Sequence, residues 1–300
     1  SASASTASRR SRAADAPPAE VIHRFNVDGM FTAGPCFFLG QTGTGKTNTM
    51  LAVVAEHAHK FETVVAFAGS MSSVSTLRRC IPDSFIYHPW DARAVKAFND
   101  LIEIQGRDVY RGRARPLLFV FDDLMFDERF PSSPEFRWTV FNCRGMGIWA
   151  LFTLQYCRQV PPGIRMQGFY AFMCRETNPE ALKGLFETFA TGFRGGEHFQ
   201  AVLDEVTRGK TALVIDKSTL GDDGEEHPAY CWFRPPGVVD YKIKFGSGAC
   251  WRYHARNFRR DWVDDSRAFR ITRSPPRRVA FGGRGARAGG AGSFAVESLR

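Results

Sequence analysis

The sequence lacks the long apolar runs that membrane-spanning helices require. No stretch approaches the roughly 18 consecutive apolar residues of such a helix. The first residues also lack the apolar stretch of a signal peptide. The seven cysteines are odd in number and include no CxxC pair, which argues against a disulfide framework and against a zinc ribbon. We therefore expect an intracellular protein with reduced thiols and no membrane span.

Lysine is scarce as well, and the positive charge is unevenly placed. Only eight of the 40 basic residues are lysines. Residues 251–300 contain 12 arginines and four acidic residues, a net of +8 out of the formal +9 of the whole chain. A basic segment of this kind attracts phosphate backbones or acidic protein surfaces.

Composition divides the chain into four regions. Residues 1–20 are rich in Ser, Ala and Pro, which predicts a disordered tail. Residues 21–246 alternate strand-like and helix-like runs, which predicts an α/β domain with a mostly parallel central sheet flanked by helices. Residues 247–273 combine aromatics with arginines, and residues 274–300 form an Arg/Gly-rich segment that is typical of a second disordered tail.

The apolar pattern gives the expected elements of the α/β domain. The expected strands are Pro35–Leu39, Thr63–Ala68, Leu117–Phe121, Ile148–Gln155, Gly168–Met173 and Thr211–Ile215. The expected helices are Lys46–His59, Ala92–Ile104, Pro134–Cys143, Pro179–Phe189 and Glu197–Val206.

One segment, GQTGTGKT at Gly40–Thr47, fits the phosphate-loop (Walker A) pattern G-x-x-x-x-G-K-[ST]. An apolar run precedes it and a helix-compatible run follows it, an order in which loop N–H groups and the helix N-terminus can bind phosphate. Lys46 would reach the β- and γ-phosphates of ATP, and the Thr47 hydroxyl would ligate Mg²⁺. The alternative is a glycine-rich turn with an incidental lysine. The predicted nucleotide-binding residues are Gly40, Gln41, Thr42, Gly43, Thr44, Gly45, Lys46 and Thr47.

A pair of acidic residues (Walker B) lies at the end of a second apolar strand. The segment RPLLFVFDDL places Asp122 and Asp123 directly after Leu117–Phe121. Asp122 is placed to hold Mg²⁺ through a water molecule, and Asp123 is placed to polarise the attacking water. Two adjacent carboxylates at a buried strand end repel each other unless a cation is near. The alternative is a solvated acidic turn, an interpretation that also suits Asp127 and Glu128.

The apolar run Trp149–Gln155 follows the acidic strand after a helix and ends in a polar residue. Roughly 70 residues separate the two earlier motifs, which suggests the branch of P-loop ATPases with an extra strand between the Walker A and Walker B strands. In that branch, a polar residue at this strand tip contacts the γ-phosphate and the attacking water. We therefore interpret Gln155 as a sensor, with a solvent-facing glutamine as the alternative.

Four segments together resemble a known family. FFLGQTGTGKT, LLFVFDDL, FNCRGMGIWALFTLQY and PPGIRMQ are similar to motifs of the DNA-packaging ATPases of large double-stranded DNA viruses, the poxvirus-type members of the FtsK/HerA superfamily. The similarity extends from about Phe31 to Asp216. It implies that residues 21–246 form a RecA-like P-loop NTPase domain. It also implies a homo-oligomeric ring that hydrolyses ATP with Mg²⁺ at subunit interfaces and drives double-stranded DNA into a capsid.

The same resemblance implies roles for individual residues. Lys46, Asp123 and Gln155 would be catalytic, and Thr47 and Asp122 would bind the metal. Arg165, in PPGIR, matches an arginine characteristic of the family and would act as a finger on the ATP of a neighbouring subunit.

A second arginine stands where the family commonly has a basic pair, often Arg-His. This chain has Arg144 followed by Gly145, so the second position departs from the pattern. A surface salt bridge is the alternative role for both Arg144 and Arg165.

The basic C-terminal region admits two interpretations. In WRYHARNFRRDW, Trp251–Trp262, aromatics interleave with arginines, which suits stacking on bases and pairing with phosphates. The same composition suits an amphipathic helix that docks on the core or on a neighbouring subunit. For Ser274–Arg300 we expect a nucleic-acid or capsid-protein contact, so that its deletion weakens DNA affinity and flattens the salt dependence of that affinity.

The leading interpretation is a translocase that packages a viral genome at the site of virion assembly in an infected cell. Its partners would be double-stranded DNA and a capsid protein or the portal vertex, and the protein itself could be part of the virion. One alternative is another FtsK/HerA-type ATPase that pumps DNA in conjugation or plasmid partition. A P-loop small-molecule kinase is a further alternative, since Arg107–Arg115 could imitate a kinase lid, although it precedes the acidic strand. A nucleic-acid-binding protein with a decayed loop is disfavoured by the intact Walker residues.

Overall fold

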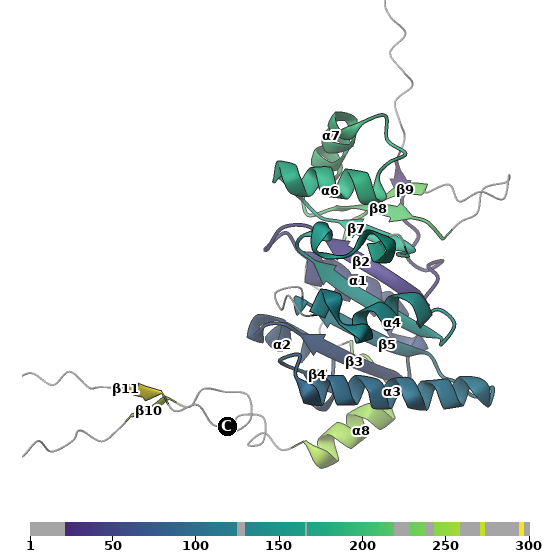
Figure 1. The fold of residues 1–300 in the computed structure, drawn as a ribbon, viewed down its shortest axis with the longest axis vertical. Coiled ribbons are helices and arrows are strands. Elements are labelled where there is room, and N and C mark those ends of the chain that lie inside the picture. Colours follow the sequence, from purple (N-terminus) through teal and green to yellow (C-terminus); the bar gives the residue numbers. More distant parts are fainter. Residues whose placement is uncertain are drawn as a thin grey trace, which may run out of the picture.

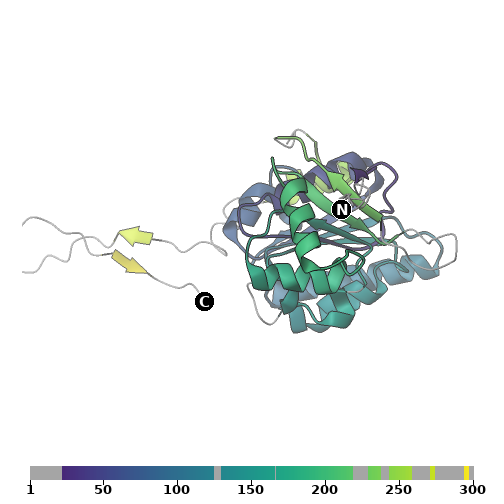
Figure 2. The same ribbon diagram turned by 90° about the horizontal axis from the view of Figure 1, so that it is seen from above.

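The computed structural model describes residues 22–124, 130–165, 167–218, 229–237, 243–258, 271–273 and 294–296. Within them, nine strands form one central sheet with helices on both faces (Figure 1; Figure 2). The strands are β1 (His23–Arg24), β2 (Gly34–Leu39), β3 (Thr63–Ala68), β4 (Ile86–Tyr87), β5 (Leu117–Asp122), β6 (Ile148–Leu154), β7 (Tyr170–Met173), β8 (Ala212–Asp216) and β9 (Ala229–Phe233). The α-helices are α1 (Lys46–His57), α2 (Met71–Leu77), α3 (Ala92–Tyr110), α4 (Pro134–Asn142), α5 (Pro162–Arg165), α6 (Pro179–Phe189), α7 (Gly196–Val206) and α8 (Gly248–Asn257).

The order of strands in the sheet is β1-β9-β8-β7-β2-β6-β5-β3-β4. Among the described strands of this sheet, six of the eight pairings are parallel, and β8 is antiparallel to both β7 and β9. This confirms the predicted α/β fold with a mostly parallel sheet. β6 lies between β2, which leads into the phosphate loop, and β5, which ends in the acidic pair. It is therefore the predicted extra strand.

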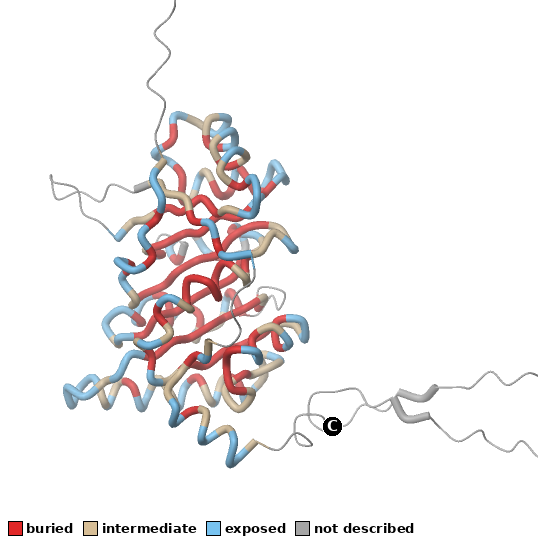
Figure 3. Tube along the Cα trace, turned by 180° about the vertical axis from the view of Figure 1, so that it is seen from behind, coloured by how far each residue is buried: buried red, intermediate tan, exposed pale blue. Residues whose placement is uncertain are grey.

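Alternation of side chains along the strands divides the core into two layers. Phe37 and Phe152 face α3, α4, α6 and α7 on one side of the sheet. Cys36 and Phe38 face α1 and α2 on the other. Strands β2, β5 and β6 are buried along their whole length, as near-continuous apolar strands covered on both faces should be (Figure 3). This buried centre fixes the strand ends that carry the polar motifs.

Some elements differ from the predicted set. The apolar pattern does not predict β1, β4, β9 or α2, and β1 and β4 contain only two residues each. Helix α3 continues to Tyr110 rather than ending near Ile104. In its added turn, the buried Gln105 donates hydrogen bonds from Nε2 to the backbone oxygens of Arg115 (3.0 Å) and Met146 (2.7 Å). Non-local contacts therefore extend this helix beyond its apolar pattern.

The aromatic and arginine-rich segment docks on the core through α8. Trp251 Nε1 donates a hydrogen bond to the backbone oxygen of Phe245 (3.0 Å), and His254 Nδ1 lies 2.9 Å from Ser84 Oγ. Of the two interpretations of this segment, docking describes α8. The continuation at 259–270 lies outside the described residues.

Several predictions fall largely or wholly outside the described part. Of the predicted tails at 1–20 and 274–300, only β11 (Phe294–Val296) is described, and it pairs antiparallel with β10 (Ile271–Arg273). Asp127 and Glu128 also lie outside it. Among the helices that can be described, none combines the length and apolarity needed to cross a bilayer.

Candidate nucleotide-binding and catalytic site

The phosphate loop connects β2 to α1 at the end of the sheet where the parallel strands terminate. We call this end the carboxyl edge and the opposite end the amino edge. Gly40, Gly43 and Gly45 have φ angles of 137°, 81° and 99°. A side chain at Gly40 would lie 3.0 Å from Cβ of Cys174, whereas Cβ atoms at Gly43 and Gly45 would meet nothing within 4 Å. The loop backbone is thus open to a ligand at its last two glycines. The 12-residue helix α1 begins directly after them, so its N-terminus adds unpaired N–H groups.

Lys46 folds back over the loop. Its Nζ donates a hydrogen bond to the backbone oxygen of Gln41 (2.8 Å), and Thr44 Oγ1 donates to the same oxygen (2.7 Å). Burial lowers the pKa of Lys46, while nearby groups that include Asp122 and Asp123 oppose this effect. The lysine charge therefore lies near both the loop backbone and the acidic pair.

Asp122 ends β5 and is 1% exposed. Its Oδ1 accepts hydrogen bonds from Thr47 Oγ1 (3.0 Å) and Thr153 Oγ1 (2.8 Å). Its buried Oδ2 has no hydrogen-bond partner among the described residues. Burial raises the pKa of Asp122, and the hydroxyls of Ser73, Thr153 and Thr47 oppose this rise only in part.

This carboxylate fits the predicted magnesium site. A buried carboxylate oxygen without a donor is costly unless a cation or a proton compensates it. The Thr47 hydroxyl already contacts the same carboxylate. Within the described ranges, no group of three or more His, Cys, Asp or Glu side chains could hold a metal by itself. A Mg²⁺ ion here would be held by Thr47, Asp122 and phosphate oxygens, a common pattern for this metal.

A side-chain hydrogen bond connects Asp123 to the residue that follows β6. Its φ of 59° lies in the left-handed region, which is uncommon for residues other than glycine. Gln155, which directly follows β6, donates a hydrogen bond from Nε2 to Asp123 Oδ1 (2.8 Å). The structure therefore brings the predicted sensor onto the carboxylate that is predicted to polarise water.

Thr153 and Gly69 also belong to this site, although no sequence motif indicates them. Thr153 Oγ1 accepts a hydrogen bond from the backbone N–H of Asp123 (2.9 Å). The backbone N–H of Gly69 donates to the backbone oxygen of Asp122 (2.8 Å), and a Cβ at Gly69 would lie 1.8 Å from the backbone oxygen of Asp123. The available sequence signal is position, because both residues lie at the carboxyl ends of strands that flank β5.

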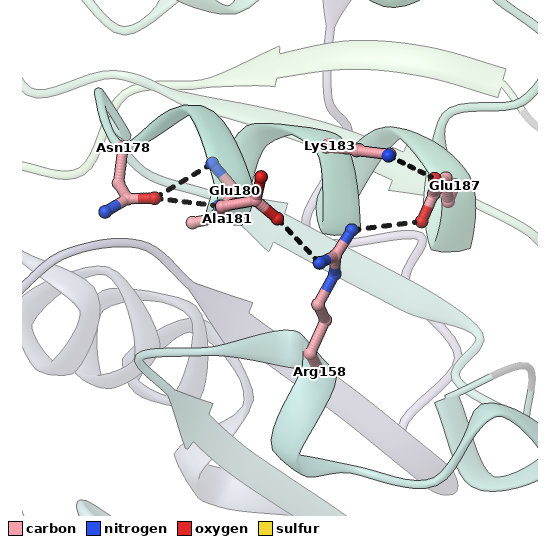
Figure 4. A network of polar contacts seen from close by, with 6 residues as sticks. All are labelled: Arg158, Asn178, Glu180, Ala181, Lys183 and Glu187. Atoms are coloured by element: carbon pink, nitrogen blue, oxygen red, sulfur yellow. Dashed lines mark hydrogen bonds and ion pairs between the residues drawn. The ribbon is translucent and has the colours of Figure 1, made fainter.

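Helix α6 anchors the segment that follows Gln155. Arg158 forms ion pairs with Glu180 (2.8 Å) and Glu187 (3.4 Å), and Asn178 caps the start of the helix (Figure 4). Exposed ion pairs contribute little to stability individually. These ion pairs therefore mainly hold the segment after Gln155 against α6, and they contribute little to the free energy of folding.

Of the two predicted arginines, only the side chain of Arg144 can be placed, and it lies away from this site. Arg144 precedes β6 at the amino edge of the sheet, and its guanidinium carbon lies 4.9 Å from the ring centroid of Phe169 and 5.8 Å from that of Phe31. Within one chain it is thus at the opposite end of β6 from Gln155. Arg165 is the last residue of α5, and its side chain lies outside the described part. The role predicted for Arg165 on a neighbouring subunit stays a prediction.

In sequence, the chain is similar to viral proteins of uncharacterized function, whereas no protein-family model matches it. It is 25% identical to protein 088R of Invertebrate iridescent virus 3 over 217 residues, which cover 71% of this chain and 80% of the relative. It is 26% identical to protein 075L of Invertebrate iridescent virus 6 over 208 residues, which cover 69% of this chain and 80% of the relative.

The solved structures similar to this one include two that carry ATP-γ-S. One is the genome packaging NTPase B204 of Sulfolobus turreted icosahedral virus 2 with ATP-γ-S, at a TM-score of 0.47 and 12% identity, covering 69% of this chain and 99% of that one. The other is the pCW3 conjugation coupling protein TcpA with ATP-γ-S, at a TM-score of 0.45 and 12% identity, covering 70% of this chain and 62% of that one.

Proposed function

We propose that the protein is an ATPase that drives double-stranded DNA into a viral capsid. One observation carries this proposal: three side-chain hydrogen bonds converge at the same site. Thr47 binds Asp122, Gln155 binds Asp123, and Lys46 binds a backbone oxygen of the phosphate loop. A phosphate loop, a metal-binding carboxylate and a carboxylate for the attacking water in one site support ATP hydrolysis. The sequence motifs that resemble packaging ATPases support DNA packaging as the work that hydrolysis drives.

Each residue has a separate task in the proposed reaction. Bound Mg²⁺ supplies positive charge for the phosphoryl group that is transferred. Thr47 and Asp122 hold the ion, and Lys46 exchanges its loop carbonyl partner for phosphate oxygens. Asp123 accepts a hydrogen bond from the attacking water and so polarises it. Gln155 holds Oδ1 of that carboxylate and thereby fixes its direction.

The proposal also places each ATP between two subunits of a homo-oligomeric ring. Arg165 of one subunit would face the phosphates of its neighbour, where a positive charge stabilises the transition state. Residues 251–300, with their net charge of +8, support binding of duplex DNA, because phosphate contacts supply sequence-independent affinity. Contact with a capsid or portal protein at the site of virion assembly completes the proposal, and the viral origin of the relatives agrees with it.

A second candidate is an FtsK/HerA-type ATPase that pumps DNA in conjugation or plasmid partition. It would use the same ATP chemistry, so association with capsid proteins discriminates between the two. A small-molecule kinase is less well supported, because the contact between Gln155 and Asp123 suits a carboxylate that polarises water.

The decisive experiment is steady-state ATP hydrolysis by the full chain, with and without duplex DNA. Lys46→Ala is the control, because it removes the lysine at the loop and leaves the rest of the site in place. We expect DNA to stimulate hydrolysis and the variant to lose that activity. Hydrolysis that is indifferent to DNA would contradict translocation. Tight ATP binding without any hydrolysis, with DNA and capsid protein present, would contradict the ATPase itself.

A further inference from the structure

Thr153 contacts both residues of the acidic pair, Asp122 at the end of β5 and Asp123 directly after it. It is the second-last residue of β6 and is 4% exposed. Its hydroxyl donates a hydrogen bond to Asp122 Oδ1 (2.8 Å) and accepts one from the backbone N–H of Asp123 (2.9 Å). A threonine hydroxyl has one donor, so this donor is fully used on the acidic pair.

The sheet itself does not fix the acidic pair from the side of β6. The last register partners of β5 and β6 are Phe121 and Phe152, one residue before Asp122. Beyond that point Asp123 takes a φ of 59°, a backbone conformation that residues with a side chain rarely adopt. The Thr153 hydroxyl thus holds the turn where the strand ladder has ended.

Gly69 contacts the backbone of the same turn from the side of β3. Its N–H binds the backbone oxygen of Asp122 (2.8 Å), and its missing side chain lets the backbone of Asp123 approach directly. The backbone of the acidic turn is therefore held by the Gly69 N–H on one side and by the Thr153 hydroxyl on the other. Of these two supports, only the hydroxyl touches a carboxylate.

We infer that Thr153 is a positioning residue whose hydroxyl sets the Asp122 carboxylate relative to Asp123. The inference deepens the proposed function and rests on it. Thr153 and Thr47 both bind Oδ1 of Asp122, which leaves the buried Oδ2 without a partner among the described residues. The two hydroxyls thereby determine which oxygen remains available to a cation. The N–H bond to Thr153 sets the backbone from which the Asp123 side chain extends.

The test separates the hydroxyl of Thr153 from its volume. Thr153→Val keeps the shape and removes the hydroxyl, and Thr153→Ser keeps the hydroxyl and removes a methyl group. ATP hydrolysis by the full chain is measured against ATP and against Mg²⁺ concentration. For Thr153→Val we expect kcat to fall about 10- to 100-fold, as for the loss of a hydrogen bond to a charged group, with little change in KM for ATP. The Mg²⁺ concentration for half-maximal rate should rise, and Thr153→Ser should stay close to the wild type.

A matched control distinguishes positioning from packing. Thr139 of α4 is fully buried, and its Oγ1 donates a hydrogen bond to the backbone oxygen of Glu135 (2.7 Å). Thr139→Val therefore removes a buried hydroxyl that does not contact the acidic pair. Equal losses of activity and melting temperature in both valine variants would overturn the inference. Unchanged kcat and Mg²⁺ dependence in Thr153→Val would overturn it too, while loss of activity in Lys46→Ala would leave the proposed function standing.

Failure of the proposed function has a different signature, namely no hydrolysis by the wild type. The Mg²⁺ dependence of ATP-γ-S binding then still tests the placement of Asp122. We expect Thr153→Val to need more Mg²⁺ than Thr153→Ser for the same affinity. Equal Mg²⁺ dependence in the two variants would overturn the inference.

Discussion

The two ends of β6 are built from different interactions. At the carboxyl end, Thr153 and Gln155 form directed hydrogen bonds to the acidic pair. At the amino end, the Trp149 ring packs against the rings of His57 and Phe61, with centroid distances of 5.6 and 5.4 Å. Directed bonds fix the positions of reacting groups, whereas aromatic packing mainly buries area. Substitutions at the carboxyl end should therefore change rates, and substitutions at the amino end should change stability.

The largest effect on rate should come from Asp123→Asn. The amide keeps the shape of the carboxylate but polarises water poorly, so we expect kcat to fall by about 10²- to 10⁴-fold. The melting temperature should stay near that of the wild type, because Gln155 can still bind the side-chain oxygen. Hydrolysis assays beside thermal unfolding test both halves of this expectation. A variant that keeps most of its activity would show that another group polarises the water.

A pair of glycines contrasts the acidic turn at the carboxyl edge with the part of helix α3 that lies against Met146, near the amino edge. In Gly69→Ala the new Cβ would lie 1.8 Å from the backbone oxygen of Asp123, so the acidic turn must move. We expect a loss of about 1–3 kcal/mol in the free energy of unfolding, together with a loss of activity. In Gly106→Ala the new Cβ would lie 3.2 Å from the flexible end of Met146, inside α3. There we expect a gain of about 0.5–1 kcal/mol and unchanged activity.

Urea unfolding and hydrolysis assays on both glycine variants provide the measurement. If Gly69→Ala were as well tolerated as Gly106→Ala, the close approach of β3 to the acidic turn would not matter for the site. The side-chain hydrogen bonds of Thr153 and Gln155 would then be the remaining difference between the carboxyl and amino ends of β6.

Gly69 shows why part of the site could be predicted from the sequence and part could not. The phosphate loop, the acidic pair and Gln155 each follow an apolar run, so local pattern places them at strand ends. Thr153 and Gly69 acquire their roles only because β6 and β3 flank β5 in the sheet. That adjacency joins segments far apart in the chain, and no local pattern encodes it.

The fold divides in a similar way. The long central strands were predictable, because strands buried on both faces need continuous apolar sequence. The antiparallel orientation of β8 was not, since its sequence is as apolar as that of a parallel strand. Strands of two residues, such as β1 and β4, are defined by their partners and carry no periodicity of their own.

At the amino edge, Arg144→Ala should have a moderate effect on stability. Its guanidinium lies over Phe31 and Phe169, and such contacts contribute about 0.5–1 kcal/mol at exposed sites. We expect a loss of that size in urea unfolding and no change in the ATP affinity of the isolated chain. Arg144→Lys should recover part of the stability because it keeps the charge. A fall in hydrolysis with unchanged stability would show instead that Arg144 acts on nucleotide in a neighbouring subunit. In that case, substitutions at the amino edge would change rates as well, contrary to the comparison above.

The smallest effect should be the response of the amino edge to acid, through His57. This side chain is 1% exposed, and its Nε2 has no hydrogen-bond partner among the described residues. Burial lowers the pKa of His57, and the positive charge of Lys60 lowers it further, whereas the backbone of Val27 and the charge of Asp28 raise it. The net direction is downward, so the folded protein resists protonation of this ring.

The sign of the resulting pH dependence follows from linkage. Because the pKa of His57 is lower in the folded protein than the value of about 6.5 in the unfolded chain, the unfolded chain binds the proton first as the pH falls. The stability contributed by His57 is therefore present above about pH 6.5 and is lost as the pH falls below it. The unfolding midpoint in urea should decline between about pH 7 and about pH 5, and decline less in His57→Phe, which keeps a ring against Trp149. Parallel curves for the two proteins would mean that His57 does not resist protonation, and acid sensitivity would then have to come from another group.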